Sequence, residues 1–257
     1  DLFEYPFLSD ELQKLQIEEL DRTNIQELEI ADFVLSHSKF TERTLLKAGV
    51  HPSKIFTIPY GVEMPVESND SNYFRDVINN EERKCQFLFV GSGIHRKGLH
   101  HLLLAWKSAN CKSSELTIVC RRIDKQITSN IEIGDRINFK RFPANAELDF
   151  IYKNSDVFVM PSLVEGFGHV YLEAMARGCF CIGTRNTGLV DIAENHASKI
   201  VPISDPNGLA IALKELETLY MQDELDKPAI KRTAAKYTWS KFRKKVAEHC
   251  RKQLQTS

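Results

Sequence analysis

The chain has 257 residues, of which 42% are hydrophobic and 27% are charged, as is usual for a globular protein with a sizeable core. At about 150 residues per domain, this length allows one large domain or about one and a half to two. The formal net charge of −1 excludes the strong basic field expected of a nucleic-acid-binding protein, so we predict no nucleic-acid partner.

The cysteines and the apolar runs indicate the cellular compartment. None of the six cysteines stands in a Cys-x-x-Cys pair, which favours buried thiols in a reducing compartment over a metal site. We expect no signal peptide, and no apolar run in the sequence approaches the roughly 20 residues that a membrane-spanning helix needs. We therefore expect a cytoplasmic location. Because the sequence begins Asp-Leu-Phe-Glu without an initiator Met, we also expect it to be part of a longer chain.

The first part of the chain has a helix–strand–helix–strand pattern. Residues 9–31 carry apolar positions at helical spacing, and residues 32–38 predict a short strand. Residues 39–48 then predict a helix and residues 55–59 another strand. Residues 67–84 are polar and charged, which predicts a linker or a surface loop.

A predicted buried strand over residues 85–90 leads into Gly91-Ser92-Gly93-Ile94-His95-Arg96-Lys97-Gly98 and then into a helix over residues 99–109. A strand, a glycine loop, the adjacent cations Arg96 and Lys97 and a helix N-terminus together suit a phosphate group. The alternative is that Arg96 and Lys97 are an exposed basic pair. The glycine spacing fits neither G-x-G-x-x-G nor the Walker A motif, so neither hydride transfer nor P-loop chemistry is predicted.

The rest of the chain alternates between strands and helices. Strands are predicted over residues 115–120, 136–142, 156–160, 179–184 and 199–202, with a polar loop or weak helix over residues 121–134. Helices are predicted from residue 145, over residues 170–176 and 206–220, and in the tail over residues 237–255. This alternation predicts an α/β fold with a doubly wound parallel sheet.

Three polar residues outside the main motifs carry weaker signals. None of the eight histidines pairs with Cys or Asp at metal-ligand spacing, and the adjacent His100 and His101 are expected to point in different directions on their helix. Asp191 is suited to cap the helix that follows the strand over residues 179–184.

Residues 161–178, Pro-Ser-Leu-Val-Glu-Gly-Phe-Gly-His-Val-Tyr-Leu-Glu-Ala-Met-Ala-Arg-Gly, follow a predicted strand and lead into a helix, the place where ligands bind in open α/β sheets. Gly166 and Gly168 lack a Cβ, so their N–H groups can approach phosphate oxygens or sugar hydroxyls at the helix N-terminus. Seven residues separate Glu165 from Glu173. The Glu173 carboxylate only accepts hydrogen bonds and therefore suits the two hydroxyls of a ribose. The alternative is a Gly-rich turn with two solvated glutamates.

The pattern Glu-Gly-Phe-Gly-x-x-x-x-Glu-Ala-Met-Ala-x-Gly resembles the E-x7-E signature of retaining, nucleotide-sugar-dependent glycosyltransferases of the GT-B fold, family 4. The resemblance implies transfer of a sugar from a UDP-, GDP- or ADP-sugar to a hydroxyl acceptor, such as a glycan or a lipid-linked sugar, with retention of anomeric configuration. It implies no cofactor and no metal, because protein cations and a helix dipole stabilise the leaving diphosphate. The alternative is a non-catalytic nucleotide-sugar-binding fragment that lacks its acceptor domain.

The resemblance also implies which residues form the site. Arg96 and Lys97 would hold the donor diphosphate and Glu165 would contact the transferred sugar, and these three form the implied catalytic set. The implied nucleotide-sugar-binding residues are Gly91, Ser92, Gly93, Arg141, Phe142, Gly166, Phe167, Gly168 and Glu173. Ser92 stands where many members have Arg, and we expect Arg96 to take over part of that role. Arg141 stands near the place where members hold the nucleobase, and a surface charge is its alternative.

By the same resemblance, residues 1–62 are the remnant of an N-terminal acceptor domain and residues 63–84 are the linker. Residues 85–236 are then the donor-binding domain, and residues 237–257 are a helix that crosses back to the first domain. The tail helix carries four cations that are compatible with peripheral contact to anionic lipid at the inner face of a membrane, namely Lys241, Arg243, Lys244 and Lys245. A solvated helix face is the alternative.

Overall fold

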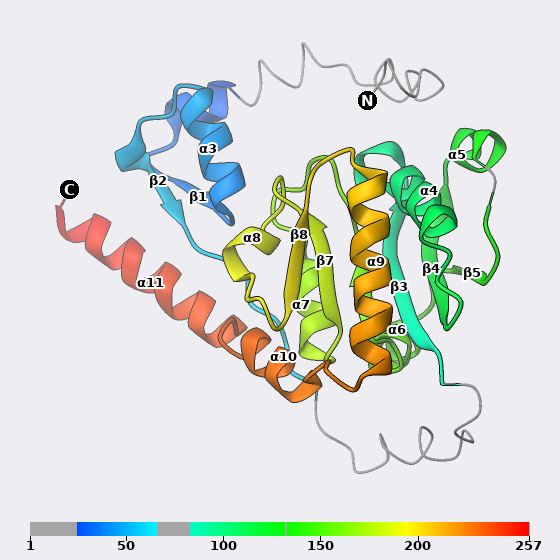
Figure 1. Ribbon diagram of the computed structural model, residues 1–257. Coiled ribbons are helices and arrows are strands. Elements are labelled where there is room, and N and C mark those ends of the chain that lie inside the picture. Colours follow the sequence, from blue (N-terminus) through cyan, green and yellow to red (C-terminus); the bar gives the residue numbers. More distant parts are fainter. Residues whose placement is uncertain (1–24, 66–82, 132, 257) are drawn as a thin grey trace.

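The computed structural model describes residues 25–65, 83–131 and 133–256. Their centre is a six-stranded sheet with the order β5-β4-β3-β6-β7-β8, in which every neighbouring pair is parallel (Figure 1). The strands are β3 (Cys85–Gly93), β4 (Ser114–Ile123), β5 (Ile137–Arg141), β6 (Val157–Val159), β7 (Phe180–Thr184) and β8 (Ser198–Val201). The predicted doubly wound α/β fold is confirmed.

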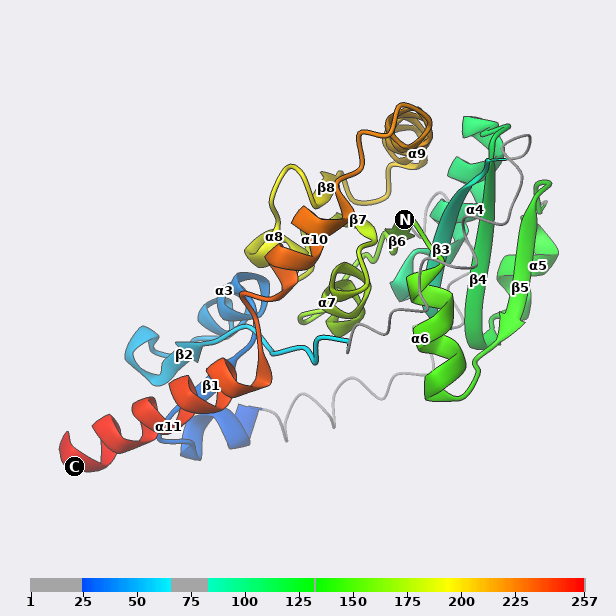
Figure 2. The same cartoon turned by 90° about the horizontal axis from the view of Figure 1, so that it is seen from below.

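Helices cover both faces of the sheet. On one face, α4 (Leu99–Ala109) packs against α9 (Pro206–Met221), and α6 (Asn145–Lys153) and α7 (His169–Ala176) lie on the other face (Figure 2). The shorter helices are α5 (Lys125–Asn130), α8 (Leu189–Ile192) and α10 (Lys227–Ala234). Because β3 and β6 are covered on both sides, their side chains from Phe87 to Val90 and throughout β6 are at most 1% exposed. This is why both strands appear as continuous apolar runs in the sequence.

The strand order reverses between β3 and β6. From β3 the chain proceeds outward through β4 and β5, then returns to β6 and proceeds the other way through β7 and β8. Ligands bind at such a switch point, outside the carboxyl ends of the two strands. The loops that leave β3 and β6 at this point are residues 94–98 and 160–168, which contain the cations and the glycines singled out in the sequence.

A smaller N-terminal unit, residues 25–62, packs beside the sheet. Its strands β1 (Val34–Ser36) and β2 (Ile55–Thr57) pair in parallel, with α3 (Lys39–Lys47) between them in the chain and the 3-10 turn η2 (Pro52–Lys54) before β2. The last helix, α11 (Trp239–Thr256), runs along this unit (Figure 1), where His249 stacks on Phe56 at a centroid distance of 3.6 Å. The tail helix therefore packs against the N-terminal unit.

Some predicted elements have different bounds in the structure. The segment predicted as polar loop or weak helix contains the end of β4 and the helix α5, whose N-cap Asp124 accepts a hydrogen bond from the Gln126 amide at 3.0 Å. The helix α10 was not predicted, although Asp226 caps it by accepting from the Ala229 amide at 2.8 Å. Most of the linker over residues 67–84 and most of the helix predicted over residues 9–31 lie outside the described residues.

Two predictions about single residues were wrong. The rings of His100 and His101 do not point apart but lie 3.9 Å from centroid to centroid, buried in α4. Burial and the neighbouring histidines lower the pKa of His100 to about 2. Asp191 does not cap the helix after β7; it lies within α8, and its Oδ2 atom accepts a hydrogen bond from the Lys39 amide of α3 at 2.8 Å. Asp191 therefore accepts a hydrogen bond from the N-terminus of α3, a helix that is distant in the sequence and lies near Asp191 only in the tertiary structure.

No helix among the described residues is both long and apolar enough for a transmembrane span. The six cysteines form no disulfide, and five of them are buried. Burial raises the pKa of the Cys120 thiol to about 12, so this thiol is protonated at neutral pH.

Candidate functional site

The loops after β3 and β6 touch each other through their backbones. The Leu163 amide donates to the Arg96 carbonyl at 2.9 Å. Gly98 adopts a φ of 71°, and a Cβ at this position would overlap the Pro161 carbonyl oxygen. Only glycine permits this approach without strain, because it has no Cβ and populates positive φ readily. The two loops therefore meet outside the carboxyl ends of β3 and β6, at the position of the crevice in which open α/β sheets bind ligands.

The predicted cations and the first predicted carboxylate meet in this crevice. Glu165 Oε2 accepts from Arg96 at 3.3 Å and also contacts the Lys97 ammonium. Arg96 donates to the Val164 carbonyl as well, at 3.0 Å. The side chains of Lys97 and Glu165 are only 16% and 17% exposed, so their ion pair is weakly screened by water. Arg96, at 47%, is the more open of the two cations.

Three backbone amides immediately before α7 have no hydrogen-bond acceptor among the described residues. The N–H groups of Gly166, Phe167 and Gly168 donate no hydrogen bond within the part of the chain that the structure describes. Gly168 adopts a φ of 80°, and a Cβ there would lie 2.7 Å from the Tyr171 ring, so this position also requires glycine. The Phe167 ring is 4% exposed and lies edge-on to Tyr60, so Phe167 can meet a ligand only through its backbone.

The N-terminal unit supplies two hydroxyls to this loop. The Gly166 carbonyl accepts from Thr41 Oγ1 at 3.0 Å and from Ser38 Oγ. Ser38 is also the N-cap of α3, where its Oγ atom accepts from the Thr41 amide at 3.0 Å. Nothing in the sequence predicted these contacts. The only available signal was a serine before a helical segment, which predicts a cap and not a partner 128 residues away.

Glu173 lies one turn into α7, and both of its carboxylate oxygens make hydrogen bonds. Its Oε1 atom is 3.1 Å from His169 Nδ1, and its Oε2 atom accepts from the Tyr152 hydroxyl of α6 at 3.3 Å. His169 Nε2 lies 2.7 Å from the Gly61 carbonyl oxygen. The hydrogen bond from His169 lowers the pKa of Glu173, and the same bond raises the pKa of His169. The carboxylate is thus ionised and fixed in orientation at neutral pH.

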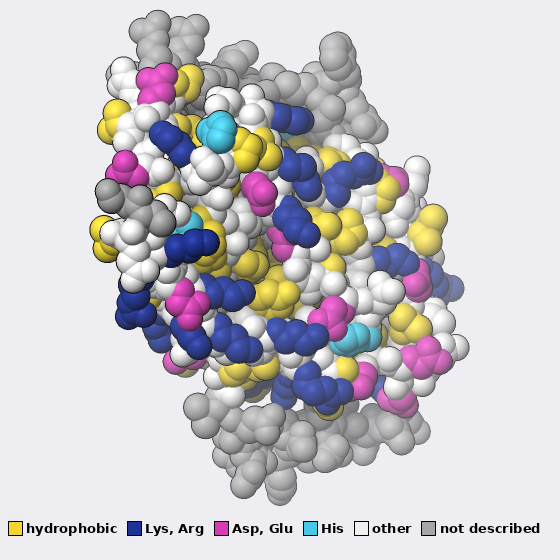
Figure 3. Space-filling model, turned by 90° about the vertical axis from the view of Figure 1, so that its left-hand side faces the viewer, with side chains coloured by type: hydrophobic (Ala, Val, Ile, Leu, Met, Phe, Trp, Pro, Cys, Tyr) yellow, Lys and Arg dark blue, Asp and Glu magenta, His cyan; other side chains and the backbone are white. Residues whose placement is uncertain are grey.

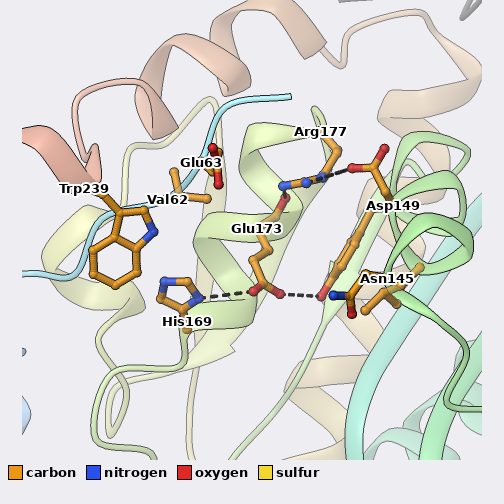
Figure 4. Close-up of a pocket in the computed structure, with 10 residues that line it drawn as sticks. Val62, Glu63, Asn145, Asp149, His169, Glu173, Arg177 and Trp239 are labelled. Atoms are coloured by element: carbon orange, nitrogen blue, oxygen red, sulfur yellow. Dashed lines mark hydrogen bonds and ion pairs between the residues drawn. The ribbon is translucent and has the colours of Figure 1, made fainter. Parts of the chain in front are cut away.

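A pocket of about 430 Å³ opens beside Glu173 (Figure 4). Its lining comes from α6, α7, the start of α11 and the segment after β2, namely Val62, Glu63, Asn145, Leu148, Asp149, Tyr152, His169, Glu173, Arg177 and Trp239. In Figure 4, the side chains of His169 and Asn145 flank Glu173 on opposite sides. Arg96, Lys97 and Glu165 do not line this pocket.

The remaining predicted residues take several positions. Gly91, Ser92 and Gly93 are the last residues of β3, and Gly93 is packed so closely that a Cβ would lie 2.9 Å from Ile123 Cγ1. Arg141 is exposed at the end of the edge strand β5. The Arg121 guanidinium covers the ring of the adjacent Phe142, 4.9 Å from its centroid. Neither Arg141 nor Phe142 lines the pocket, which instead contains Asn145 and Leu148 from the first turn of α6.

The described residues offer little for a metal ion. They contain no group of three or more His, Cys, Asp or Glu side chains placed to hold one. The charged side chains that meet where the two loops touch are instead two cations, Arg96 and Lys97, and one carboxylate, Glu165.

The fold of the chain is the GT-B fold of solved glycosyltransferase structures. The structure aligns with sucrose-phosphate synthase from Thermosynechococcus elongatus at a TM-score of 0.74 and 22% identity, covering 97% of this chain and 67% of that chain. It aligns with Anabaena HepE, solved in complex with UDP and glucose, at a TM-score of 0.71 and 17% identity, covering 90% of this chain and 66% of that chain.

The chain belongs to the family of glycosyl transferases group 1, whose family model matches residues 70–235. An uncharacterized glycosyltransferase of Methanocaldococcus jannaschii is 26% identical over 195 residues, which are 73% of this chain and 50% of the relative. The O-antigen chain mannosyltransferase of Salmonella typhimurium is 30% identical over 149 residues, which are 56% of this chain and 42% of the relative. The chain thus spans half or less of the length of these curated relatives.

Proposed function

We propose that this chain binds a nucleotide-sugar donor and takes part in transferring its sugar to a hydroxyl acceptor with retention of anomeric configuration. The observation that carries the proposal is the meeting of Arg96, Lys97 and Glu165 in one crevice beside the N-terminus of α7. A donor of this kind has an anionic diphosphate between two hydroxyl-rich sugars. The crevice offers cations and amides to the diphosphate, and Glu173 lies one turn along the same helix for the ribose.

Typical free-energy contributions indicate which groups do most to stabilise the leaving diphosphate. A charge-assisted hydrogen bond contributes about 1.5–3 kcal/mol net, and a helix N-terminus typically contributes about 0.3–1 kcal/mol. Arg96 and Lys97 therefore dominate the stabilisation of the leaving group, and the amides of Gly166 and Gly168 orient the donor. Glu165 contacts both cations, and a bound diphosphate would compete with it for them. No metal is needed in this scheme.

Both carboxylates already contact side chains of the protein, and this favours a front-face reaction. Glu165 contacts two cations, and Glu173 contacts His169 and Tyr152. Neither is arranged as the free nucleophile that retaining glycosidases use. In the proposed step, the acceptor hydroxyl attacks the anomeric carbon while the bond to the diphosphate oxygen breaks, and that oxygen takes the hydroxyl proton. The acceptor is proposed only as a hydroxyl compound, such as a glycan or a lipid-linked sugar.

Calorimetric titration with UDP, GDP and ADP tests donor binding. UDP is the first choice, because the Anabaena relative in fold was solved with it. We expect one of the three to bind to the wild-type chain and to bind more weakly to Lys97→Ala. The absence of binding by all three would remove the proposal. A transfer assay with the matching nucleotide-sugar then separates an enzyme from a donor-binding fragment without catalysis, which is favoured if binding occurs and this chain gives no turnover.

The domain division at residues 62 and 84 and the cellular location are part of the same proposal. We place the protein in the cytoplasm with peripheral contact to anionic lipid through α11, whose cations Lys241, Arg243, Lys244 and Lys245 are all exposed. Figure 3, which faces the side where α11 and the N-terminal unit lie, displays many Lys and Arg side chains. Co-sedimentation with vesicles that contain phosphatidylserine, but not with neutral vesicles, is the expected result. Equal recovery with both vesicle types would exclude this contact.

A further inference from the structure

The first residue of α7, His169, has a hydrogen-bond acceptor at each ring nitrogen. Glu173 Oε1 lies 3.1 Å from Nδ1, and the Gly61 carbonyl oxygen lies 2.7 Å from Nε2. A neutral imidazole donates from only one nitrogen, whereas a carbonyl and an ionised carboxylate only accept. Both contacts are hydrogen bonds only if the ring carries both protons. The geometry therefore selects the imidazolium form.

Two aromatic rings hold the imidazole in place. The Trp239 indole, at the start of α11, stacks on it at a centroid distance of 5.4 Å with an interplanar angle of 30°. Tyr60 meets it edge-on at 5.9 Å. A cation stacked on an indole face is favoured electrostatically. His169 thus connects the helix that carries Glu173 with the segment after β2 and with the start of α11, as Figure 4 shows for Trp239.

The other ionisable groups around the pocket do not replace Glu173 as the partner of His169. Asp149 and Arg177 pair with each other at 2.7 Å, so their charges largely offset. Glu63 is exposed on the segment after β2. The Tyr152 phenol donates to the second oxygen of Glu173, and burial raises its pKa well above the usual value. Among the described lining residues, Glu173 is the charged group in hydrogen-bonding contact with the ring.

We propose that His169, as an imidazolium, is a positioning residue that orients the Glu173 carboxylate for the ribose hydroxyls of the donor and ties it to the Gly61 carbonyl. The inference rests on the proposed function, in which Glu173 binds the ribose. An ionised carboxylate has about four lone-pair sites. His169 occupies one site on Oε1 and Tyr152 one site on Oε2, so one site on each oxygen stays available to the 2′ and 3′ hydroxyls.

Loss of the His169 proton removes one of the two hydrogen bonds, because the neutral ring can donate to only one partner. The raised pKa of His169 places this loss above the ordinary value of 6.5. Ribose binding should therefore weaken as the pH rises through the pKa of His169 in the folded protein. Binding that does not involve the ribose hydroxyls should not follow this titration.

The test measures the affinity of the full chain for UDP and for 2′,3′-dideoxyuridine diphosphate between about pH 6 and about pH 9, the range in which a raised histidine titrates. Both probes carry the same diphosphate and base, so their own titrations cancel in the comparison. We expect His169→Ala to weaken UDP binding about tenfold near neutral pH, as for the loss of one charge-assisted hydrogen bond. In this variant the affinity for UDP should also depend on pH no more than the affinity for the dideoxy probe does. His169→Gln donates to only one partner and should give an intermediate, pH-independent affinity for UDP. For the dideoxy probe, wild type and both variants should bind alike.

A matched control and a ligand-free measurement complete the design. His51→Ala removes an exposed histidine of the N-terminal unit and should leave the affinity for UDP unchanged. In the free protein, an NMR titration should give a pKa for His169 that falls when Glu173 is changed to Gln. This reports on the contact even if His169→Ala folds poorly.

The outcomes separate the inference from the function on which it rests. If Glu173→Gln weakens UDP binding while the His169 variants match wild type at every pH, the positioning role is wrong and the proposed function stands. If wild type binds UDP and its dideoxy analogue equally and Glu173→Gln changes neither affinity, the assignment of Glu173 to the ribose is wrong, and the inference with it. If wild type binds none of UDP, GDP and ADP, the proposed function itself is wrong.

Discussion

The Lys97 ammonium contacts the Glu165 carboxylate, although 68 positions of sequence separate the two residues. One follows β3 and the other follows β6, and these strands are neighbours at the point where the strand order reverses. The contact joins the two halves of the sheet at the edge where the strand order reverses. It is also the feature that the proposed donor site depends on.

Replacing Lys97 by Ala should weaken the binding of the cognate nucleoside diphosphate about 10- to 100-fold, because it removes a charge-assisted hydrogen bond of ~1.5–3 kcal/mol from the diphosphate. Lys199→Ala is the matched control, since Lys199 also pairs with a glutamate, Glu215, but at the far edge of the sheet. Calorimetry at one ionic strength compares the two variants. Equal losses in both would indicate a general charge effect and contradict a specific contact.

Replacing Gly98 by Ala should destabilise the fold more than the same change at Gly49. Both glycines have positive φ, 71° and 88°, which costs a non-glycine residue of order 1–3 kcal/mol. A Cβ at Gly98 would in addition overlap the Pro161 carbonyl, whereas a Cβ at Gly49 meets nothing within 4 Å. Chemical denaturation of both variants gives the comparison. A cost at Gly98 no larger than at Gly49 would show that the two loops separate freely, contrary to a shared crevice.

Ser38→Ala should cost about 0.5–2 kcal/mol of stability as the loss of an N-cap and should also loosen the Gly166 loop. Hydrogen exchange over residues 164–168 measures the second effect. Thr44→Ala is the control, because the Thr44 hydroxyl bonds only within α3, to the Phe40 carbonyl at 2.8 Å. If both variants leave exchange in the loop unchanged, the contact with the N-terminal unit does not hold the loop.

The pair of His169 and Glu173 should make stability depend on pH at both ends of the range. The pKa of His169 is raised in the folded chain, so its contribution is full below the unfolded value of 6.5 and is lost as the pH rises through the folded value. The pKa of Glu173 is lowered, so its contribution is full above 4.5 and is lost as the pH falls through its folded value. The stability difference between wild type and His169→Ala should therefore be largest at mildly acidic pH. A difference that grows steadily toward alkaline pH would contradict the assignment.

Much of the fold was predictable because buried strands and helices leave strong local patterns. Apolar runs marked β3 and β6, and the predicted helix over residues 99–109 has the bounds of α4. Weak local signals were missed, as for α10, a short helix with few apolar positions whose start was marked by the Asp226 cap and by Pro228 in the first turn. The rings of His100 and His101 converge because neighbours on a helix are only about 100° apart and both reach the same buried space.

By itself, the sequence determined which loops could bind an anion, because a glycine that needs positive φ and a cation next to a helix N-terminus are local properties. Tertiary structure decided which groups those loops meet: Glu165 with Lys97, Gly166 with Ser38, and His169 with the Gly61 carbonyl. It also placed Asn145, and not Arg141, in the lining of the pocket beside Glu173. The physical reason is strand order, since parallel strands far apart in the sequence become neighbours through packing and bring their carboxyl ends to one edge.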